Sequence, residues 1–488
     1  MNFSEFSFWW VLLLTSIPFF TVRYVGKLFD WWRDRFDTVG IAALSLLLFL
    51  NASPTSFAVF IFEILFNYFM VSLMLRREGS QARLIATAII VFDVAVLAYF
   101  KYLTFFIEDF VGLAVPIQNN WQAEFPLPVF QDIPPGLSFY TFQMVAFVVD
   151  SFTARRKKPL KLLDYINFVS FFPQIVAGPI ERRGNLLPQI QNFKFKFTAD
   201  NFDVGMRWLS LGLFMKFVLA DNLSPYITDG MAETANPWLI WFYAFLFTLR
   251  IYFDFGGYSF MAVGIARIIG VKLTINFLAP YTSQSINEFW RRWHVSLSTW
   301  FRDYVFLPLM GKRKKWAAFF LFLTFTLSGF WHGAAWNFMI WGAYHGALLL
   351  LLRYAGRPFS RLTNRFVKKP QIVSWALTFG AVILGCLFFM ETNSWRLLAK
   401  LKTLITPWAY SPDNFTQAIT IFNSPEGLVL GVALALAIAF LALEHIAVWQ
   451  ERASEYELLT SAWMSKVLLV LTILLAANTP SEFIYFEF

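Results

Sequence analysis

The sequence predicts an all-α, polytopic membrane protein. Of its 488 residues, 58% are hydrophobic, 20% are aromatic and only 15% are charged, whereas a soluble domain carries about 25% charged residues. Apolar runs near ~20 residues long recur along the chain, which is the length of helix that crosses the hydrocarbon core of a bilayer. Because these runs continue from end to end, we expect one integral membrane domain over residues 1–488.

The apolar runs give the expected membrane helices in order. They suggest roughly 11 transmembrane helices, of which the clearest cover residues 6–22, 40–51, 57–75, 84–103, 136–152, 208–220, 238–255, 258–277 and 467–477. The first run has neither a basic leader nor a small-residue cleavage pattern, so we expect a retained span and not a signal peptide. Residues 168–177 are apolar but too short to span, and prolines and glycines interrupt them, which indicates a re-entrant or in-plane segment.

The basic residues predict the orientation of the chain. The net charge is +9, which in a soluble protein would suggest nucleic-acid binding, but here Lys and Arg gather in short loops between apolar runs. The basic loops are 23–37, 76–83, 153–161 and 353–369, and the segments without Lys or Arg are 104–135 and 411–426. The excess of positive charge on cytoplasmic loops places the first group inside and both chain ends outside. We expect no nucleic-acid partner.

The cysteine and histidine content argues against a metal centre. The chain has a single cysteine, Cys386, so it forms neither an internal disulfide nor a cysteine cluster. His332 and His345 are thirteen residues apart with no carboxylate between them, which differs from the i, i+4 pairing of zinc helices. We therefore expect no bound metal.

Three of the four histidines lie between residues 287 and 346, and this stretch is the candidate active site. Ser285 and Glu288 form a Ser-x-x-Glu capping box that predicts a helix start at Ser285. We expect this helix to continue to about Gly311 with one aromatic face, to lie at the cytoplasmic interface, and to carry His294 at the edge of that face. Its basic residues either anchor the helix or attract an anionic donor; they are Arg291, Arg292 and residues 312–315.

His332 lies in a nearly uncharged apolar stretch, residues 319–352, between two glycines. Burial disfavours the imidazolium form, so a neutral imidazole at this depth suits a general base that accepts a hydroxyl proton. The alternative is a core histidine bonded to a neighbouring helix. We expect His345 to support the site, and we expect Asp254 either to pair with an arginine or to line a polar cavity.

Several ordered stretches resemble the membrane-bound O-acyltransferases, and in particular the bacterial branch that acetylates alginate and other extracellular polysaccharides. The stretches are residues 133–142, 176–180, 254–259, 280–304, 329–334 and 341–346, so the motif-bearing core covers about 130–350. The resemblance implies a ring of helices around a thin centre pierced by a tunnel. Gly256 and Phe260 stand where that branch carries serine and aspartate, so we expect no second carboxylate beside Asp254.

The resemblance also implies roles for individual residues. His332 and His294 correspond to the two motif histidines and are the expected catalytic residues. Residues expected to bind substrate or line the tunnel are Asp254, Asn287, Glu288, Trp290, Arg291, Arg292, Trp331 and Asn337. His345 and Tyr258 are expected to support them from behind.

The function implied by the resemblance is acyl transfer across the bacterial cytoplasmic membrane. The acyl group, acetyl in our first hypothesis, would leave a cytoplasmic thioester, either acetyl-CoA or an acyl carrier protein, without any bound cofactor. The acceptor would be hydroxyls of an alginate-like exopolysaccharide, reached directly or through an extracytoplasmic acetyltransferase or relay partner. The alternatives are O-acetylation of peptidoglycan or cellulose, D-alanyl transfer to teichoic acid, and a transporter that carries the donor without chemistry.

Overall fold

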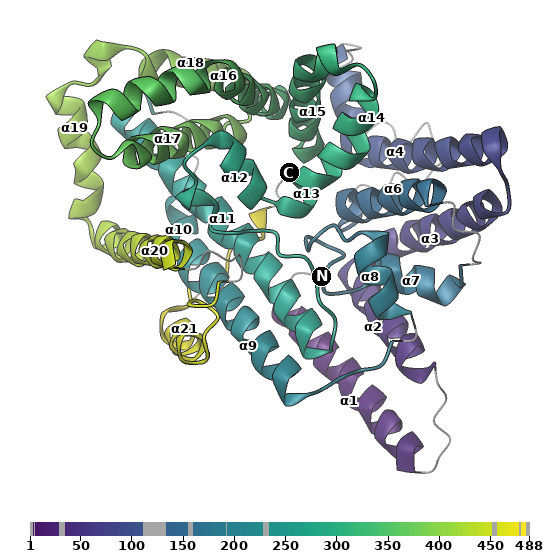
Figure 1. Cartoon of the computed structure of the whole chain (residues 1–488). Helices are drawn as coiled ribbons and strands as arrows, with labels where there is room; N and C mark the ends of the chain where they lie inside the picture. Colours follow the sequence, from purple (N-terminus) through teal and green to yellow (C-terminus); the bar gives the residue numbers. More distant parts are fainter. Residues whose placement is uncertain are drawn as a thin grey trace, which may run out of the picture. The chain divides into compact units, whose positions relative to one another are not determined.

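The computed structural model describes residue 3 and residues 5–28, 35–110, 133–154, 160–191, 193–227, 234–450, 456–477 and 480–484. Every regular element in these ranges is a helix (Figure 1), so the all-α prediction is confirmed. Most of the predicted outer segment, residues 111–132, lies outside the described ranges.

Seven helices in the described part of the chain are long and apolar enough to cross a membrane. They are α1 (Phe6–Leu28), α3 (Pro54–Leu75), α4 (Gly79–Phe110), α11 (Pro237–Ile268), α16 (Trp336–Phe366), α17 (Pro370–Met390) and α20 (Pro425–Gln450). Two shorter apolar helices are α2 (Phe36–Ala52) and α21 (Ala462–Leu475). The protein is therefore a multi-pass membrane protein, and the expected count of roughly 11 spans stays a prediction.

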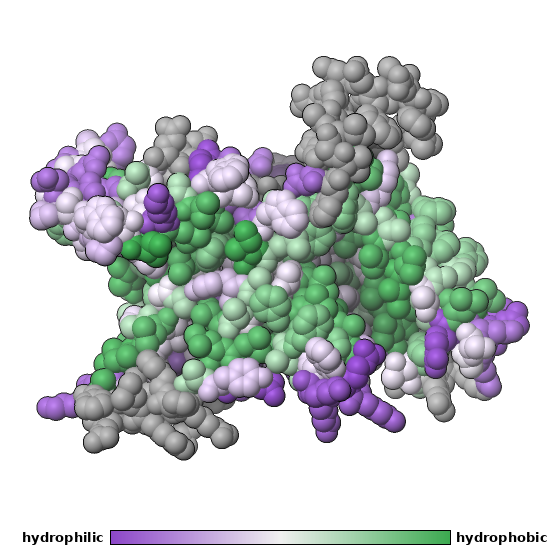
Figure 2. All heavy atoms as spheres, turned by 90° about the horizontal axis from the view of Figure 1, so that it is seen from above, coloured by the Kyte–Doolittle hydropathy of each residue, from purple (hydrophilic) through white to green (hydrophobic). Residues whose placement is uncertain are grey.

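Most of these helices expose apolar side chains. Leu84 is 71% exposed and Ile473 is 76% exposed, and on the face drawn in Figure 2 hydrophobic residues form much of the surface while hydrophilic residues gather towards its margins. Lipid is the solvent that accommodates such a surface. Helix α11 differs, because 72% of its apolar window is buried by protein.

The chain divides into two compact units, of which unit 1 comprises Met1–Gly205 and Ile265–Thr274. In unit 1, α3, α4 and α6 (Leu137–Thr153) lie side by side (Figure 1). The unit also holds α7 (Leu162–Ser170) and α8 (Arg183–Ile190), and α9 (Ala199–Leu213) begins there. The predicted in-plane stretch forms no spanning helix: α7 ends at Ser170, and residues 171–180 form buried turns. Their depth in the membrane stays a prediction.

Unit 2 comprises Met206–Gly264 and Ile275–Phe488 and holds every candidate site residue. It begins with the end of α9, the π-helix η1 (Phe214–Ala220), α10 (Asp221–Leu223) and η2 (Ser224–Tyr226), which precede α11. Short segments follow: η4 (Pro280–Thr282), α12 (Ile286–Arg292), α13 (Val295–Phe301), η5 (Arg302–Phe306), α14 (Leu307–Met310) and η6 (Lys314–Trp316). The unit ends with α15 (Ala317–His332), α16, α17, α18 (Ser394–Leu404), η7 (Pro407–Ala409), α19 (Pro412–Ile419), η8 (Thr420–Asn423), α20 and α21.

Two predicted spans, residues 238–255 and 258–277, fall on one continuous helix, α11, which already ends at Ile268, so that part of the prediction is wrong. The glycines between them pack α11 against the preceding helix and do not break it. A Cβ added at Gly257 would lie 2.9 Å from both the Gly212 oxygen and the Lys216 nitrogen. Close approach of two helix backbones, which glycine permits, explains these residues.

The apolar stretch 319–352, in contrast, is divided between two helices. Helix α15 ends at His332, and α16 begins at Trp336. The two helices pack closely, since a Cβ added at Gly329 would lie 2.8 Å from the Gly342 nitrogen. This turn places His332 at the end of a helix, facing residues of α16 and α17.

Candidate active site

Helix α12 begins where the sequence predicted. Ser285 is its N-cap, and the Ser285 Oγ accepts a hydrogen bond from the Glu288 nitrogen at 3.2 Å. The Glu288 carboxylate accepts a hydrogen bond from the Gln284 nitrogen at 2.9 Å and pairs with Arg292 at 2.8 Å. Glu288 and Arg292 thus form an ion pair one turn apart that stabilises the helix itself.

The predicted continuation of this helix through His294 is wrong. Helix α12 ends at Arg292, and His294 has φ 42° and ψ 56°, in the left-handed region. For a residue other than glycine this conformation costs about 1–2 kcal/mol. Asn276 offsets that cost, because its backbone oxygen accepts from the Val295 nitrogen at 2.9 Å and its Oδ1 accepts from the Ser296 nitrogen at 3.2 Å. Asn276 thereby caps the new helix α13.

The turn moves His294 from the expected helix edge into the interior. His294 is 1% exposed, and its ring lies 4.7 Å from Phe255, 6.2 Å from Phe277 and 6.4 Å from Trp331, measured between centroids. Burial lowers the pKa of His294 to about 3, because the low-dielectric surroundings disfavour the imidazolium. His294 is therefore neutral at physiological pH.

His332, the last residue of α15, is 5% exposed. Three aromatic rings surround its imidazole edge to face, with centroids 4.9 Å away for Trp331, 5.1 Å for Trp341 and 5.3 Å for Phe389. Trp331 also contacts His294, so one indole lies against both candidate histidines. The expected burial of His332 in apolar surroundings is confirmed.

A small cavity of about 20 Å³ lies beside His332. His345, from α16, lines the same cavity and is 2% exposed. The other lining residues are Ile251, Tyr281, Phe289, Trp293, Trp341, Val382, Cys386 and Phe389. The structure therefore brings together two histidines that the sequence leaves thirteen residues apart.

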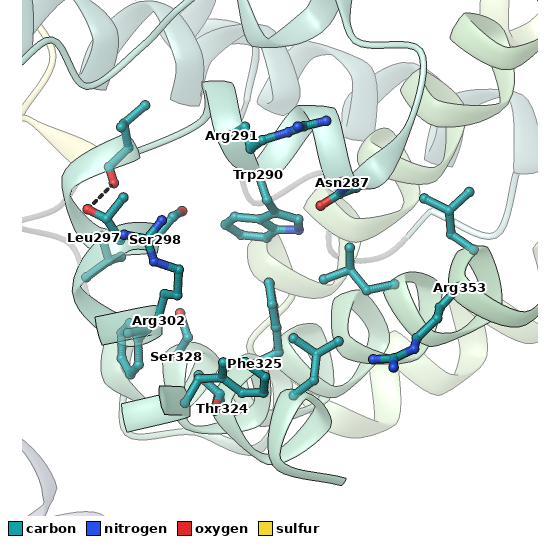
Figure 3. Close-up of a pocket in the computed structure, with 17 residues that line it drawn as sticks. Asn287, Trp290, Arg291, Leu297, Ser298, Arg302, Thr324, Phe325, Ser328 and Arg353 are labelled. Carbon is teal, nitrogen blue, oxygen red and sulfur yellow. Dashed lines mark hydrogen bonds between the residues drawn. The ribbon is translucent and has the colours of Figure 1, made fainter. Parts of the chain in front are cut away.

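A second, larger cavity of about 650 Å³ lies in the same unit. Arginines from three elements line it: Arg291 from α12, Arg302 from η5 and Arg353 from α16 (Figure 3). Between them the walls are largely apolar, with Trp290 and Phe325 near the centre of the view. Such a cavity suits a ligand with an anionic end and an apolar body.

Trp290 connects the two cavities. It lines the larger one, and its ring lies 5.1 Å from Phe325, 5.6 Å from Trp341 and 5.1 Å from His345. Trp341 and His345 line the smaller cavity. One indole therefore stands between the arginine-lined space and the space beside His332. Of the other predicted residues, Asn287 also lines the larger cavity.

Asp254 and Tyr258 line neither cavity. The Asp254 carboxylate pairs with Lys216 at 2.8 Å, and Lys216 also pairs with Asp221 at 2.8 Å. Asp254 accepts a further bond from the Ile484 nitrogen at 2.7 Å. The expectation of an arginine partner for Asp254 is thus wrong, because its ion-pair partner is a lysine from η1.

Two further predicted residues make contacts that hold elements near His332 or near His294 in place. The Asn337 side-chain nitrogen donates to the Phe388 oxygen at 3.1 Å, which ties the start of α16 to the end of α17. Tyr258 stacks on Phe483 at 4.6 Å. Asn337 thereby holds the neighbour of Phe389, a ring beside His332, and neither Asn337 nor Tyr258 lines either of the two cavities.

Sequence reasoning missed a buried carboxylate, Glu444. The Tyr252 hydroxyl donates to Glu444 and lies 3.3 Å from the Tyr456 hydroxyl. The Tyr252 ring packs 5.0 Å from Tyr281, a wall of the small cavity. The feature of the sequence that indicates Glu444 is a carboxylate within an apolar span. Arg302 and Arg353, which line the larger cavity, and Cys386, which lines the smaller one, were also not predicted as site residues. In the described part of the chain, no group of three or more His, Cys, Asp or Glu residues is arranged to hold a metal ion.

Comparison with known proteins identifies the family. The model of the membrane-bound O-acyltransferase (MBOAT) family matches residues 1–393. A peptidoglycan O-acetyltransferase from Helicobacter pylori is 30% identical over 473 residues, which covers 87% of this chain and 86% of that protein.

Two further relatives carry other acceptors in their names. A protein from Azotobacter vinelandii named "Probable alginate O-acetylase AlgI" is 33% identical over 82% of this chain and 75% of its own length. A teichoic acid D-alanyltransferase from Bacillus subtilis is 31% identical over 52% of this chain and 68% of its own length. With its helical architecture and its apolar spans, this chain is an acyltransferase enzyme that belongs to the membrane-bound O-acyltransferase family.

Proposed function

We propose that this protein transfers an acyl group, acetyl in the first instance, from a cytoplasmic thioester to hydroxyls of a polysaccharide outside the bacterial cytoplasmic membrane. The observation that carries the proposal is the position of His332, which is buried and lines a small cavity together with His345. A buried imidazole between aromatic walls is suited to remove a proton from a hydroxyl where water is scarce.

The proposed reaction balances without any cofactor. His332 accepts the proton of the acceptor hydroxyl while the oxygen of that hydroxyl bonds to the carbonyl carbon of the thioester. The carbon–sulfur bond breaks, its electron pair stays on sulfur, and the proton held by His332 passes to that thiolate. The products are an ester and a thiol. His294, neutral and buried beside Trp331, would stabilise the charge that develops on the carbonyl oxygen.

The arginine-lined cavity is the proposed site for the thioester donor. A phosphate-bearing donor such as acetyl-CoA, or the prosthetic group of an acyl carrier protein, would place its phosphate near Arg291, Arg302 and Arg353. Arginine binds phosphate through a fork of donors, which explains the choice of residue. The apolar walls would take the remainder of the donor, and the thioester would point past Trp290 towards His332.

For the acceptor, we favour an extracellular polysaccharide such as alginate, reached directly or through a relay partner. Peptidoglycan is the second candidate, because a relative that covers most of the chain is named for it. O-acetylation of cellulose and D-alanylation of teichoic acid stay alternatives. Analysis of acetyl esters on the polymers of the source cell, with and without this protein, distinguishes these acceptors.

The catalytic assignment is tested with His332→Ala in isolated membranes. Radiolabelled acetyl-CoA is supplied, and both acetyl ester formation and thiol release are measured. We expect the variant to lose at least about a hundredfold in activity, the usual contribution of a general base. His445→Ala is the matched control, because His445 is exposed and lies outside both cavities. Wild-type activity in His332→Ala at normal protein level would refute the assignment, and thioester uptake without ester formation would favour a transporter.

A further inference from the structure

We propose that the small cavity beside His332 is the pocket for the acyl group, and that its walls restrict the enzyme to a two-carbon, uncharged acyl group. This inference rests on the proposed function, since it assigns the residues that select the donor's acyl chain. It also separates acetyl transfer from transfer of longer chains and from D-alanyl transfer.

The first argument is the volume. The cavity measures about 20 Å³, and a cavity needs roughly 10–15 Å³ to hold a single water. A methyl group is of similar size to water, so the methyl of an acetyl group fits and each additional methylene does not. Every lining residue is at most 9% exposed, so a longer chain would have to displace buried side chains.

The second argument is the stiffness of the walls. Trp341 and Phe389 pack edge to face at 5.4 Å, and Phe289 and Trp293 stack at 5.5 Å. Tyr281 is fixed at both ends: its hydroxyl donates to the Thr248 oxygen at 2.5 Å, and its backbone oxygen accepts from the Trp375 indole at 2.8 Å. Close-packed aromatic walls resist expansion, so an extra methylene costs about 1–3 kcal/mol.

The third argument is charge. The lining residues in the described part of the chain include no aspartate or glutamate. The ammonium group of an aminoacyl thioester would therefore be buried without a counter-ion, which is far more costly than burying a methyl group. The pocket thus disfavours D-alanyl donors and accepts acetyl donors.

The fourth argument is a polar atom that needs a partner. Nδ1 of His345 has no hydrogen-bond partner in the described part of the structure, although the side chain is 2% exposed. An unsatisfied buried polar atom costs about 1–3 kcal/mol. The carbonyl of a thioester whose methyl fills this cavity would offer an acceptor to the His345 imidazole, which lines the cavity together with His332.

Two residues of α17, Val382 and Cys386, allow the size of the pocket to be changed without altering the aromatic rings around His332. They are four residues apart and line the cavity from one face of the helix. Val382→Ala enlarges the cavity, and Cys386→Leu fills it. Val373→Ala, an identical change on the same helix at a position that does not line the cavity, is the matched control.

The test uses the full-length protein in lipid nanodiscs with acetyl-CoA, propionyl-CoA and butyryl-CoA as probe donors and a soluble oligosaccharide as acceptor. Products are quantified by mass spectrometry. For the wild type we expect kcat/KM to fall by about 10–200-fold from acetyl to propionyl, the discrimination that one methylene allows. Val382→Ala should raise the propionyl-to-acetyl ratio by about tenfold, whereas Val373→Ala leaves it unchanged. Cys386→Leu should lose acetyl transfer while remaining monodisperse on size exclusion.

The outcomes separate the pocket from the function on which it rests. If the wild type transfers acetyl and propionyl equally well, or if Val382→Ala leaves the ratio unchanged, the pocket is refuted while acyl transfer stands. If Val382→Ala does not fold, unchanged acetyl transfer by Cys386→Leu refutes the pocket in the same way. If the wild type and all variants transfer nothing from any thioester, with or without cell extract as acceptor, then the proposed function fails first and the pocket fails with it.

Discussion

Trp290 and His345 pack edge to face, with ring centroids 5.1 Å apart and ring planes at 89°. Trp290 lines the arginine-lined cavity, and His345 lines the small cavity beside His332. The contact is therefore the boundary between the proposed donor site and the proposed acyl pocket.

Replacing Trp290 tests that boundary. We expect Trp290→Ala to connect the two cavities and to admit water to His332. Thioester hydrolysis without an acceptor should then rise by about tenfold, which corresponds to about 1.4 kcal/mol, while ester formation falls. Thiol release with and without acceptor measures both rates. Trp316→Ala is the control, because Trp316 is 52% exposed and lies away from both cavities. Equal hydrolysis in Trp290→Ala and wild type would show that the indole is not a barrier.

The arginines of the larger cavity should affect donor binding more than turnover. For Arg291→Ala and Arg353→Ala we expect KM for acetyl-CoA to rise by about tenfold, because each variant loses one charged contact worth about 1.4 kcal/mol. We expect kcat to stay within a factor of about two of the wild-type value. Added salt should raise the wild-type KM, because these side chains are exposed. Steady-state kinetics at two salt concentrations measure the effect. Arg313→Ala is the control, as Arg313 is exposed and does not line the cavity. A fall in kcat at constant KM would contradict a donor-binding role.

The buried state of His294 predicts a pH dependence of stability. Burial lowers the pKa of His294 to about 3, below the value of about 6.5 of an unperturbed histidine. Between these values the unfolded chain binds a proton that the folded chain does not, so stability falls as pH drops below about 6.5. From pH 7.5 to 5 the loss from this residue is about 2 kcal/mol. We expect a smaller drop of melting temperature over that interval for His294→Asn than for wild type. An identical drop in the two proteins would contradict the prediction.

Lys216 predicts a large effect on stability. It is 1% exposed and pairs with both Asp221 and Asp254. Lys216→Met leaves two buried carboxylates without their cation, and we expect a loss of about 3–5 kcal/mol. The triple variant in which Asp221 and Asp254 also become asparagine should recover much of it. Thermal unfolding in detergent is the measurement, and Lys466→Met, at an exposed position of α21, is the control. An unchanged melting temperature in Lys216→Met would show that the pairs contribute little.

The start of α12 shows how far local sequence information reaches. Ser285 and Glu288 lie three residues apart, so the capping interaction is encoded within one turn and is read correctly from the sequence. After the end of the same helix, a new helix, α13, begins where the Val295 and Ser296 nitrogens donate to the backbone oxygen and Oδ1 of Asn276, a residue that lies outside both helices. Helical periodicity carries no record of that residue, which is why a continuous helix through His294 was predicted.

For Asp254 as well, the sequence predicts only part of what the structure shows. The sequence shows a carboxylate in an apolar helix, which indicates a partner but does not name it. The partner is Lys216 on η1, and the pairing follows from the close approach of Gly212 and Gly257. Likewise, the apolar span around Glu444 gives no sign that Tyr252 and Tyr456 would meet it.

By itself the sequence determined the all-α membrane class, the family, the N-terminus of α12 and the burial of His332. These properties depend on composition, on motifs and on interactions within a few residues, all of which are written along the chain. Only the tertiary structure decided that His294 is buried by a left-handed turn, that His332 and His345 share a cavity, and that three arginines from α12, η5 and α16 line one space. Each of these depends on side chains from distant segments, and their meeting is fixed by packing, not by sequence spacing.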